Sequence, residues 1–298
     1  MEWQGVFPAI TTPFHDDLSV DHAFLAEHAR WMIESSCRGI VALGSLGEGA
    51  TLECSEKIEI LRTLVKTLGE LPVVAGISSL STREAVSLAQ DAERAGCQGL
   101  MVLPPYVYST DWREMKAHVA AIIGATNLSC MLYNNPVAYR TDFLAEHVCE
   151  LADEFPNLHA VKESSGDVRR VTNLRALCGD RLKIFVGVDD VLVEGVAAGA
   201  EGWIAGLVNA CPIESVRLFE AAHEGRTEDA FDLYRWFLPL LRLDTVPKFV
   251  QLIKMVQAEV GMGGETVRPP RLVLEGIERE TTLHLIRESL SRRPVSVG

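Results

Sequence analysis

The chain has 298 residues, of which 48% are hydrophobic and 23% are charged, and its formal net charge is -13 at pH 7. A chain of this length can bury a large core, as one barrel-sized domain or as two ordinary domains. The acidic balance excludes the electrostatic footprint of a nucleic-acid-binding protein, because phosphate binding needs clustered Lys and Arg and Arg169-Arg170 is only a local pair.

Short apolar runs alternate with longer segments of helical periodicity from the N-terminus onward, which is typical of a parallel sheet wrapped by helices. Helix starts are indicated at Asp21, at Ser55 and after Ser81. We expect eight strands, at residues 6–10, 39–43, 71–76, 99–103, 128–133, 158–162, 183–186 and 202–204. Eight such units favour a single α/β domain, a TIM (β/α)8 barrel, over an open sheet with a second domain.

From Thr227 onward the strands stop and the periodicity is helical. We therefore expect a catalytic barrel at residues 1–225 and a C-terminal helical extension, packed on the barrel, at residues 226–298. Gly261-Met262-Gly263-Gly264 is expected to be a loop between helices, since it follows no strand and matches no phosphate-binding spacing.

The chain carries no signal for a membrane segment, a metal or a cofactor. The most apolar stretch, residues 191–208, is interrupted by Glu194, Glu201 and several glycines, and the N-terminus does not resemble a signal peptide. No histidines show metal-ligand spacing. Seven cysteines without a close pair are interpreted mostly as small buried hydrophobes of a cytoplasmic protein: Cys37, Cys54, Cys97, Cys130, Cys149, Cys178 and Cys211.

The candidate nucleophile is Lys162, the last residue of an apolar strand that is followed by a Ser/Gly turn and a helix expected from Asp167. Most lysines are solvated surface charges, but the other lysines here lie on helical patterns or, for Lys183, at the start of a strand. An apolar barrel behind Lys162 would lower the pKa of its amine and leave it able to attack a carbonyl. We expect Lys162 to form a Schiff base.

The other strand ends supply candidate partners, because reactive groups of such barrels lie at the face built by the strand-to-helix loops. Tyr133, on the neighbouring strand, is expected to move protons for the lysine. The Ser45 hydroxyl and the Leu46 N–H are expected to hold a substrate carboxylate. Tyr106, Gly187 and Ile204 are expected to complete the substrate site. Glu48, Asp189 and Asp190 are candidate bases, although acidic residues at these positions are more often helix caps.

These motifs resemble the dihydrodipicolinate synthase and N-acetylneuraminate lyase family of class I aldolases, dehydratases and deaminases. The resemblance spans the chain and rests on residues 7–14, 44–48, 133–136 and 161–166. It implies a barrel with a helical extension, a Schiff base on Lys162, a proton relay through Tyr133, a small carboxylate substrate and a homo-oligomer, as tetramer or dimer.

Several residues depart from the pattern of the synthases of this family. Synthases of this family carry two successive hydroxyl residues in the loop where this chain has Ser45-Leu46, and the aromatic that a neighbouring subunit contributes to their relay would fall at Val107. Tyr106 or Tyr108 could compensate for it. The arginine that holds the aldehyde substrate would fall near Ala138, with Arg140 as the stand-in.

Other motifs are similar to 1-pyrroline-4-hydroxy-2-carboxylate deaminases of hydroxyproline catabolism, at residues 133–136, 164–170, 202–206 and 268–271 and at Tyr139. The resemblance implies release of ammonia and 2-oxoglutarate semialdehyde. Three alternatives stay open: a pyruvate-dependent aldolase or 2-keto-3-deoxy sugar acid dehydratase, a 4-hydroxy-tetrahydrodipicolinate synthase-like enzyme, and a non-enzymatic barrel. Whether Arg140, Tyr139 or Tyr108 reaches the pocket is also left open.

Overall fold

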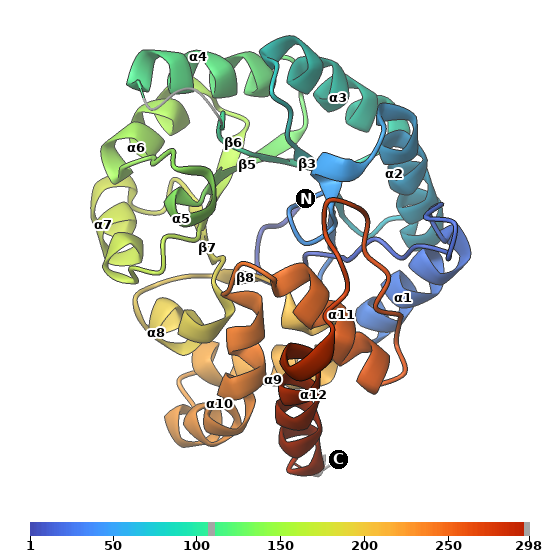
Figure 1. The fold of residues 1–298 in the computed structure, drawn as a ribbon. Coiled ribbons are helices and arrows are strands. Elements are labelled where there is room, and N and C mark those ends of the chain that lie inside the picture. Colours follow the sequence, from blue (N-terminus) through green and yellow to red (C-terminus); the bar gives the residue numbers. More distant parts are fainter. Residues whose placement is uncertain (107–110, 295–298) are drawn as a thin grey trace.

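The computed structural model describes residues 1–106 and 111–294, and it contains the predicted barrel (Figure 1). Eight parallel strands lie in the order β1-β8-β7-β6-β5-β4-β3-β2. The barrel closes between β1 and β2 through a parallel bridge from Ala9 to Val41 and a hydrogen bond of 2.9 Å from Ile10 N to Val41 O. The strands are β1 (Gly5–Pro8), β2 (Ile40–Ala42), β3 (Val73–Ile77), β4 (Gly99–Val102), β5 (Ser129–Asn134), β6 (Leu158–Glu163), β7 (Lys183–Val186) and β8 (Gly202–Ala205).

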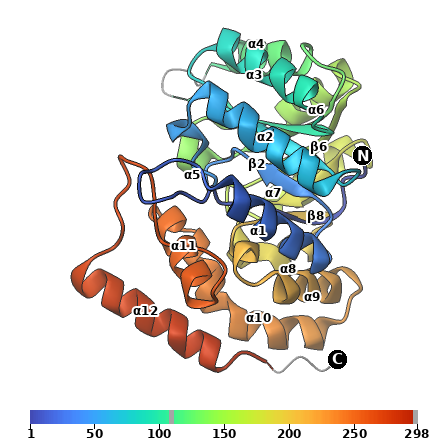
Figure 2. The same ribbon diagram turned by 90° about the vertical axis from the view of Figure 1, so that its right-hand side faces the viewer.

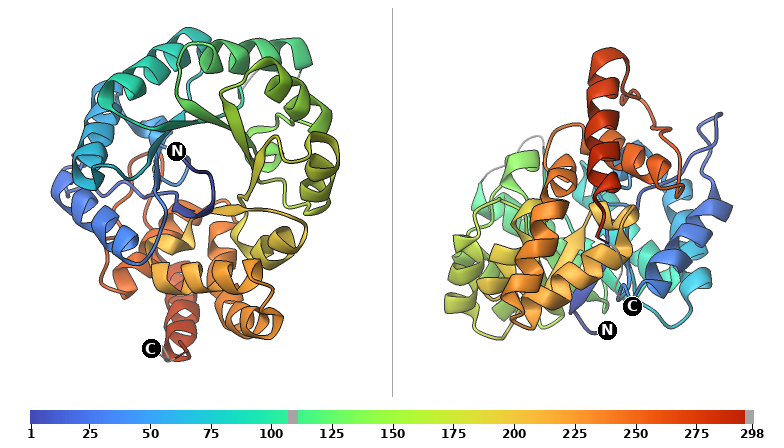
Figure 3. Two further views of the ribbon diagram at one scale, coloured as in Figure 1. Left: turned by 180° about the vertical axis from the view of Figure 1, so that it is seen from behind. Right: turned by 90° about the horizontal axis from the view of Figure 1, so that it is seen from below.

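Helices surround the strands, as the view from behind in Figure 3 shows. Short 3-10 turns lie at the strand ends or between helices: η1 (Gly49–Thr51), η2 (Asp189–Val191), η3 (Leu207–Asn209) and η4 (Arg242–Asp244). The helices of the barrel part are α1 (His22–Glu34), α2 (Cys54–Leu68), α3 (Thr82–Ala95), α4 (Trp112–Ile123), α5 (Pro136–Tyr139), α6 (Ala145–Glu154), α7 (Arg169–Cys178), α8 (Leu192–Ala197) and α9 (Pro212–His223).

The predicted strand positions are confirmed, while some helix starts differ by one or two residues. Asp21 caps α1 by accepting a hydrogen bond from Phe24 N, and Ser81 caps α3. The helix after the lysine strand begins at Arg169 instead of Asp167, because the Asp167 carboxylate accepts from the N–H and the guanidinium of Arg169. A side chain that binds the first turn in this way lies before the helix.

Three helices follow the barrel: α10 (Thr227–Leu241), α11 (Phe249–Glu259) and α12 (Gly276–Ser291). Figure 2 shows α12 on the outer side of α10 and α11, away from the strands. The loop between α11 and α12 contains the predicted segment 261–264. The division of the chain at residue 225 stays a prediction. No helix of the described residues is long and apolar enough to cross a membrane.

The core has two layers, as the alternation of side chains along a strand requires. Trp3, Phe7 and Phe185 pack with each other inside the barrel, with ring centroids 5.9 to 6.0 Å apart. On β6, Ala160 faces this inner cluster and Val161 faces the outer cluster beneath the helices. Lys162 therefore points inward, like Ala160.

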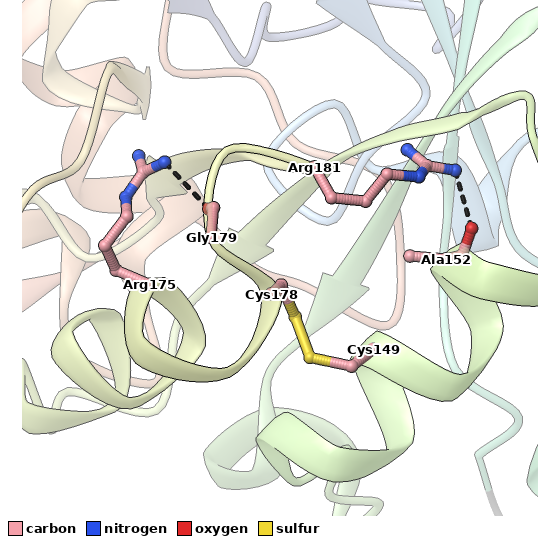
Figure 4. Close-up of a disulfide and its surroundings, with 6 residues drawn as sticks. All are labelled: Cys149, Ala152, Arg175, Cys178, Gly179 and Arg181. Atoms are coloured by element: carbon pink, nitrogen blue, oxygen red, sulfur yellow. Dashed lines mark hydrogen bonds between the residues drawn. A yellow bond between two sulfur atoms is a disulfide. The ribbon is translucent and has the colours of Figure 1, made fainter.

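A disulfide joins α6 to α7, between Cys149 and Cys178 (Figure 4). Beside it, Arg181 donates to the Ala152 carbonyl and Arg175 to the Gly179 carbonyl. The interpretation of the cysteines as small buried hydrophobes is wrong for this pair, because consecutive barrel helices lie side by side and bring the two positions together. It is also wrong for Cys54, which is exposed, and it holds for Cys37, Cys97, Cys130 and Cys211, where burial raises the thiol pKa to about 12.

Candidate active site

Lys162 and Tyr133 lie side by side in the barrel, because β5 and β6 pair with these two residues in register. Lys162 is 6% exposed, and its Nζ lies 4.3 Å from the centroid of the Tyr133 ring. Within the described part of the chain, Nζ donates no hydrogen bond and forms no ion pair. The amine is thus held against an aromatic face without a fixed acceptor, which is what a nucleophile needs.

A polar network fixes the ends of these two strands. The Asn134 amide donates to Glu163 Oε2 at 2.9 Å and to Asp142 Oδ1 at 3.2 Å. Arg170 holds Asp142 through two hydrogen bonds of 2.6 and 2.7 Å. Burial raises the pKa of Glu163, against the hydrogen bonds that it accepts from Asn134 and Ser165. Glu163 lies on the opposite face of the strand from Lys162, so its role is to position the strand end.

The Tyr133 hydroxyl accepts a hydrogen bond from a neighbouring side chain. Asn135 Nδ2 donates to Tyr133 Oη at 2.9 Å, so the phenol proton is available to another acceptor. Tyr139, from α5, packs edge-on to the Tyr133 ring at 5.8 Å and forms a short hydrogen bond with Ser45 Oγ. Burial and then Tyr133 raise the pKa of Tyr139, and Ser45 opposes them. Tyr139 therefore stays a neutral phenol between Ser45 and Tyr133.

Tyr106 extends this aromatic group outward. Its ring lies 5.5 Å from the Tyr139 ring, and its hydroxyl is 3.3 Å from Ser78 Oγ. Val107 and Tyr108 lie outside the described residues. Arg140 is exposed at the end of α5, whereas the positive charge of Arg271 is close enough to lower the pKa of Tyr139.

The loop after β2 presents its backbone to the site. The Leu46 side chain is 4% exposed and belongs to the outer core cluster, so only its backbone can meet a ligand. Among the residues that the structure describes, the N–H groups of Ser45 and Leu46 donate to no protein acceptor. A Cβ at Gly49 would overlap the Leu43 carbonyl oxygen, so the close return of this loop requires glycine there.

The Glu48 side chain makes no hydrogen bond that caps η1, and it is held instead in a buried ion pair. Its carboxylate is fully buried, accepts from Lys254 Nζ at 2.7 Å and from Arg268 N at 3.0 Å, and lies 3.7 Å from Arg271. Lys254 also donates to the carbonyls of Thr12 and Thr266. Burial lowers the pKa of Lys254 and Glu48 opposes this effect. The ion pair between Glu48 and Lys254 connects the loop after β2 to α11.

Asp189 was expected to cap its own turn, η2, but its side chain makes no hydrogen bond within that turn. Its carboxylate accepts from Trp203 Nε1 at 3.0 Å and from the N–H groups of Gly206 and Leu207, at the start of η3. Burial raises the pKa of Asp189 to about 6, against these hydrogen bonds and the charge of Lys162. Asp190 lies 3.7 Å from Arg242.

The structure brings most of the predicted site residues together. A Cβ at Gly187 would approach Lys162 Cε to 2.5 Å, and Ile204 lies with Tyr133 in the inner cluster. Ser45 and Tyr106 join this group through Tyr139. A separate cavity of about 280 Å³, lined by residues including Thr11, Phe14, Lys254 and Gly264, contains none of the predicted site residues.

Comparison with known proteins identifies the family. The sequence model of the Dihydrodipicolinate synthetase family matches residues 2–289. The chain belongs to this family. It is 30% identical to a 4-hydroxy-tetrahydrodipicolinate synthase of Bartonella bacilliformis, over 93% of this chain and 95% of that protein. It is 32% identical to one of Methanopyrus kandleri, over 97% and 96%.

Solved structures of the dihydrodipicolinate synthetase family share the fold. A 4-hydroxy-tetrahydrodipicolinate synthase of Methylacidiphilum fumariolicum superposes with a TM-score of 0.92 at 29% identity, over 98% of both chains. A dihydrodipicolinate synthase of Acinetobacter baumannii, in complex with pyruvate, superposes with a TM-score of 0.91 at 27% identity, over 96% of this chain and 98% of that one. The chain is an enzyme of this family, a class I Schiff-base lyase. The alternative of a non-enzymatic barrel is therefore wrong.

Proposed function

We propose that this family member is a lyase that eliminates a hydroxyl group from a small 2-keto-acid-like substrate, and that it acts as a 1-pyrroline-4-hydroxy-2-carboxylate deaminase. Lys162 is the Schiff-base nucleophile and Tyr133 is the proton carrier. The products are 2-oxoglutarate semialdehyde and ammonia.

The arrangement around Ser45 carries the proposal. The residue after Ser45 has no hydroxyl, and its side chain is buried in the outer core cluster. The Ser45 hydroxyl is bonded to Tyr139, which packs on Tyr133. A relay through two successive loop hydroxyls, which the synthase resemblance implies for condensation, therefore has no second member here. A neutral Tyr139 near Tyr133 is compatible with a reaction that uses a single substrate, as the deaminase reaction does, in contrast to the two-substrate condensation of a synthase.

The substrate carboxylate is expected to bind at the loop after β2. The N–H groups of Ser45 and Leu46 have no protein acceptor among the described residues, and backbone N–H groups of a turn are good anion donors. Arg271 adds a positive charge near Tyr139, since it lowers the pKa of that phenol. Gly187 leaves room for the Lys162 stem, and Tyr106 and Ile204 line the remaining sides.

The chemistry then follows from the lysine. The Lys162 amine adds to C2 of the cyclic imine, and Tyr133 gives its proton to the departing ring nitrogen. The same phenol oxygen, now ionised, removes a proton from C3 to give the enamine. The enamine expels the hydroxyl group on C4 and leaves a C3=C4 double bond. A proton shift from C5 to C3, followed by tautomerisation of the resulting C4=C5 enamine, converts the C5 amine to an imine. Hydrolysis of this imine and of the Lys162 iminium releases ammonia, the semialdehyde and the free lysine.

The decisive experiment is a proton NMR time course of the purified protein with 1-pyrroline-4-hydroxy-2-carboxylate, with ammonia quantified in parallel. The wild type should convert the pyrroline and release ammonia. Lys162→Ala should do neither and should lose borohydride trapping of the substrate. A folded wild-type protein that releases no ammonia contradicts the proposal, and trapping that persists in Lys162→Ala moves the nucleophile to another residue.

A second candidate function is 4-hydroxy-tetrahydrodipicolinate synthase, which the names of the relatives favour. The two functions are separated by supplying pyruvate and aspartate semialdehyde in the same assay, because a synthase consumes both and releases no ammonia. Cleavage of a 2-keto-3-deoxy sugar acid to pyruvate would identify an aldolase instead, and loss of water from it a dehydratase. Assembly into a tetramer or dimer stays a prediction.

A further inference from the structure

The extension contributes one carboxyl group to the strand-end face of the barrel. Asp244 is the last residue of η4, between α10 and α11. Its carboxyl group packs on Gly206, which directly follows β8, so closely that a Cβ at Gly206 would overlap it. α11 contacts η3, the turn that follows Gly206. The view from below in Figure 3 shows the extension helices against the barrel.

Asp244 Oδ1 is buried and has no hydrogen-bond partner among the described residues, although the residue as a whole keeps some exposed surface. Its neighbour Asp189 differs, because three donors already satisfy that carboxylate. A buried polar atom without a partner costs free energy, and in a native protein it calls for an explanation such as a catalytic role. The missing partner is therefore expected to come from a ligand.

Burial and the neighbouring carboxylates favour the protonated form of Asp244. Burial raises the pKa of Asp244 well above its usual range, and the negative charges of Asp189 and Asp190 raise it further. The positive charge of Lys162 opposes them. On its own turn, Arg242 lies 3.7 Å from Asp190 and so directs its charge there. In its protonated form the Asp244 carboxyl group has an O–H that can donate a proton to a group held by Lys162.

We propose that Asp244 is the general acid that protonates the hydroxyl group leaving C4 of the substrate bound to Lys162. This inference rests on the proposed function. C4 is three bonds from Nζ, so a substrate held by the lysine extends from it toward groups on the same face. The inference applies equally to a 2-keto-3-deoxy sugar acid, which loses the same hydroxyl group.

The step balances as follows. The C2=C3 electron pair of the enamine moves to C3=C4, and the nitrogen lone pair restores the iminium on Lys162. The C4–O bond breaks with its pair on oxygen, which takes the proton of Asp244 and leaves as water. Hydrolysis of the iminium by water later leaves an ammonium on Lys162, and this ammonium returns a proton to the Asp244 carboxylate.

The same acid separates elimination from condensation. Joining pyruvate to an aldehyde breaks no C–O bond to a leaving hydroxyl group, so a synthase has no use for a protonated carboxyl at this position. A deaminase or dehydratase needs one, because hydroxide is a poor leaving group and a positioned acid contributes about 10²- to 10⁴-fold to such a step.

The test compares Asp244→Asn with the wild type on 1-pyrroline-4-hydroxy-2-carboxylate and on pyruvate. Asp244→Asn should release ammonia about 10²- to 10⁴-fold more slowly, while borohydride still traps pyruvate on Lys162 at the wild-type rate. The kcat of the wild type should fall as pH rises through the pKa of Asp244, because the acid must hold its proton, and Asp244→Asn should lack this fall. The matched control is Asp232→Asn, an exposed aspartate of α10, which should behave as the wild type.

The outcomes distinguish the two proposals. A wild type that releases no ammonia overturns the proposed function and this inference with it. A wild type that releases ammonia and an Asp244→Asn variant of equal rate overturn this inference alone, and so does a variant that loses pyruvate trapping along with turnover. If Asp244→Asn does not fold, Asp244→Ala with added formate replaces it. Recovery of ammonia release supports an acid at this position, and a folded variant without recovery contradicts it.

Discussion

Gly187, which directly follows β7, lies against the side chain of Lys162, and its replacement by alanine tests the geometry of the site. A methyl group at this position would lie 2.5 Å from Lys162 Cε and 2.8 Å from Lys162 Cγ, and it would overlap the Ser164 hydroxyl. Carbon atoms in contact prefer about 3.5–4.0 Å, so the lysine stem must move by roughly 1 Å.

The expected effect on activity is larger than the effect on stability. The obstructing atoms belong to side chains, which can shift while the backbone stays in place, and overpacking of this kind costs about 1–3 kcal/mol. A displacement of about 1 Å in a reacting group costs about 10²-fold in rate. Gly187→Ala should therefore lower the rate of Schiff-base formation on Lys162 about 100-fold and keep its fold.

The assay measures the rate at which borohydride traps a keto-acid substrate on Lys162, together with the midpoint of urea unfolding. Gly264→Ala is the control, because a Cβ there meets no atom within 4 Å. It should change neither quantity. If Gly187→Ala traps substrate at the wild-type rate, the placement of the Lys162 stem against Gly187 is refuted.

Three further changes have defined outcomes. Tyr133→Phe should lower kcat by about 10²- to 10⁴-fold, because the proton carrier is lost, and a kcat near that of the wild type would contradict the role. Lys254→Met leaves the Glu48 carboxylate buried without its cation and should lower the free energy of unfolding by about 3–5 kcal/mol; in urea unfolding, the double change with Glu48→Gln should recover most of the loss. Cys149→Ser removes a crosslink between residues 29 apart and should lower that free energy by about 3–4 kcal/mol through loop entropy, and reductant should then destabilise the wild type but not the variant.

The strands could be predicted from the sequence because parallel barrel strands are buried on both faces and read as short apolar runs. Lys162 and Tyr133 could be predicted as partners for a related reason: the carboxyl ends of parallel strands share one face, so neighbouring strand ends become neighbouring side chains. The helix starts were less certain, since Asp167 can bind the first turn of a helix from outside it.

The rest of the site depends on contacts that local patterns do not contain. Ser45 and Tyr139 are 94 residues apart, and Glu48 and Lys254 are 206 apart. Asp244 lies in no motif, and its signal is a buried carboxyl oxygen that has no hydrogen-bond partner among the described residues. The disulfide could have been suspected, because Cys149 and its partner lie on consecutive helices of a barrel.

The buried ion pair between Glu48 and Lys254 has a consequence for redesign and for inheritance. Glu48 belongs to the loop that presents Ser45 and Leu46, while Lys254 belongs to α11. If the extension of one relative replaced that of another, one of these two charges would be buried without its partner unless the loop after β2 was exchanged as well. Variation in substrate choice should therefore proceed by paired substitutions in residues 44–49 and 244–271, as if the two segments were a single heritable unit.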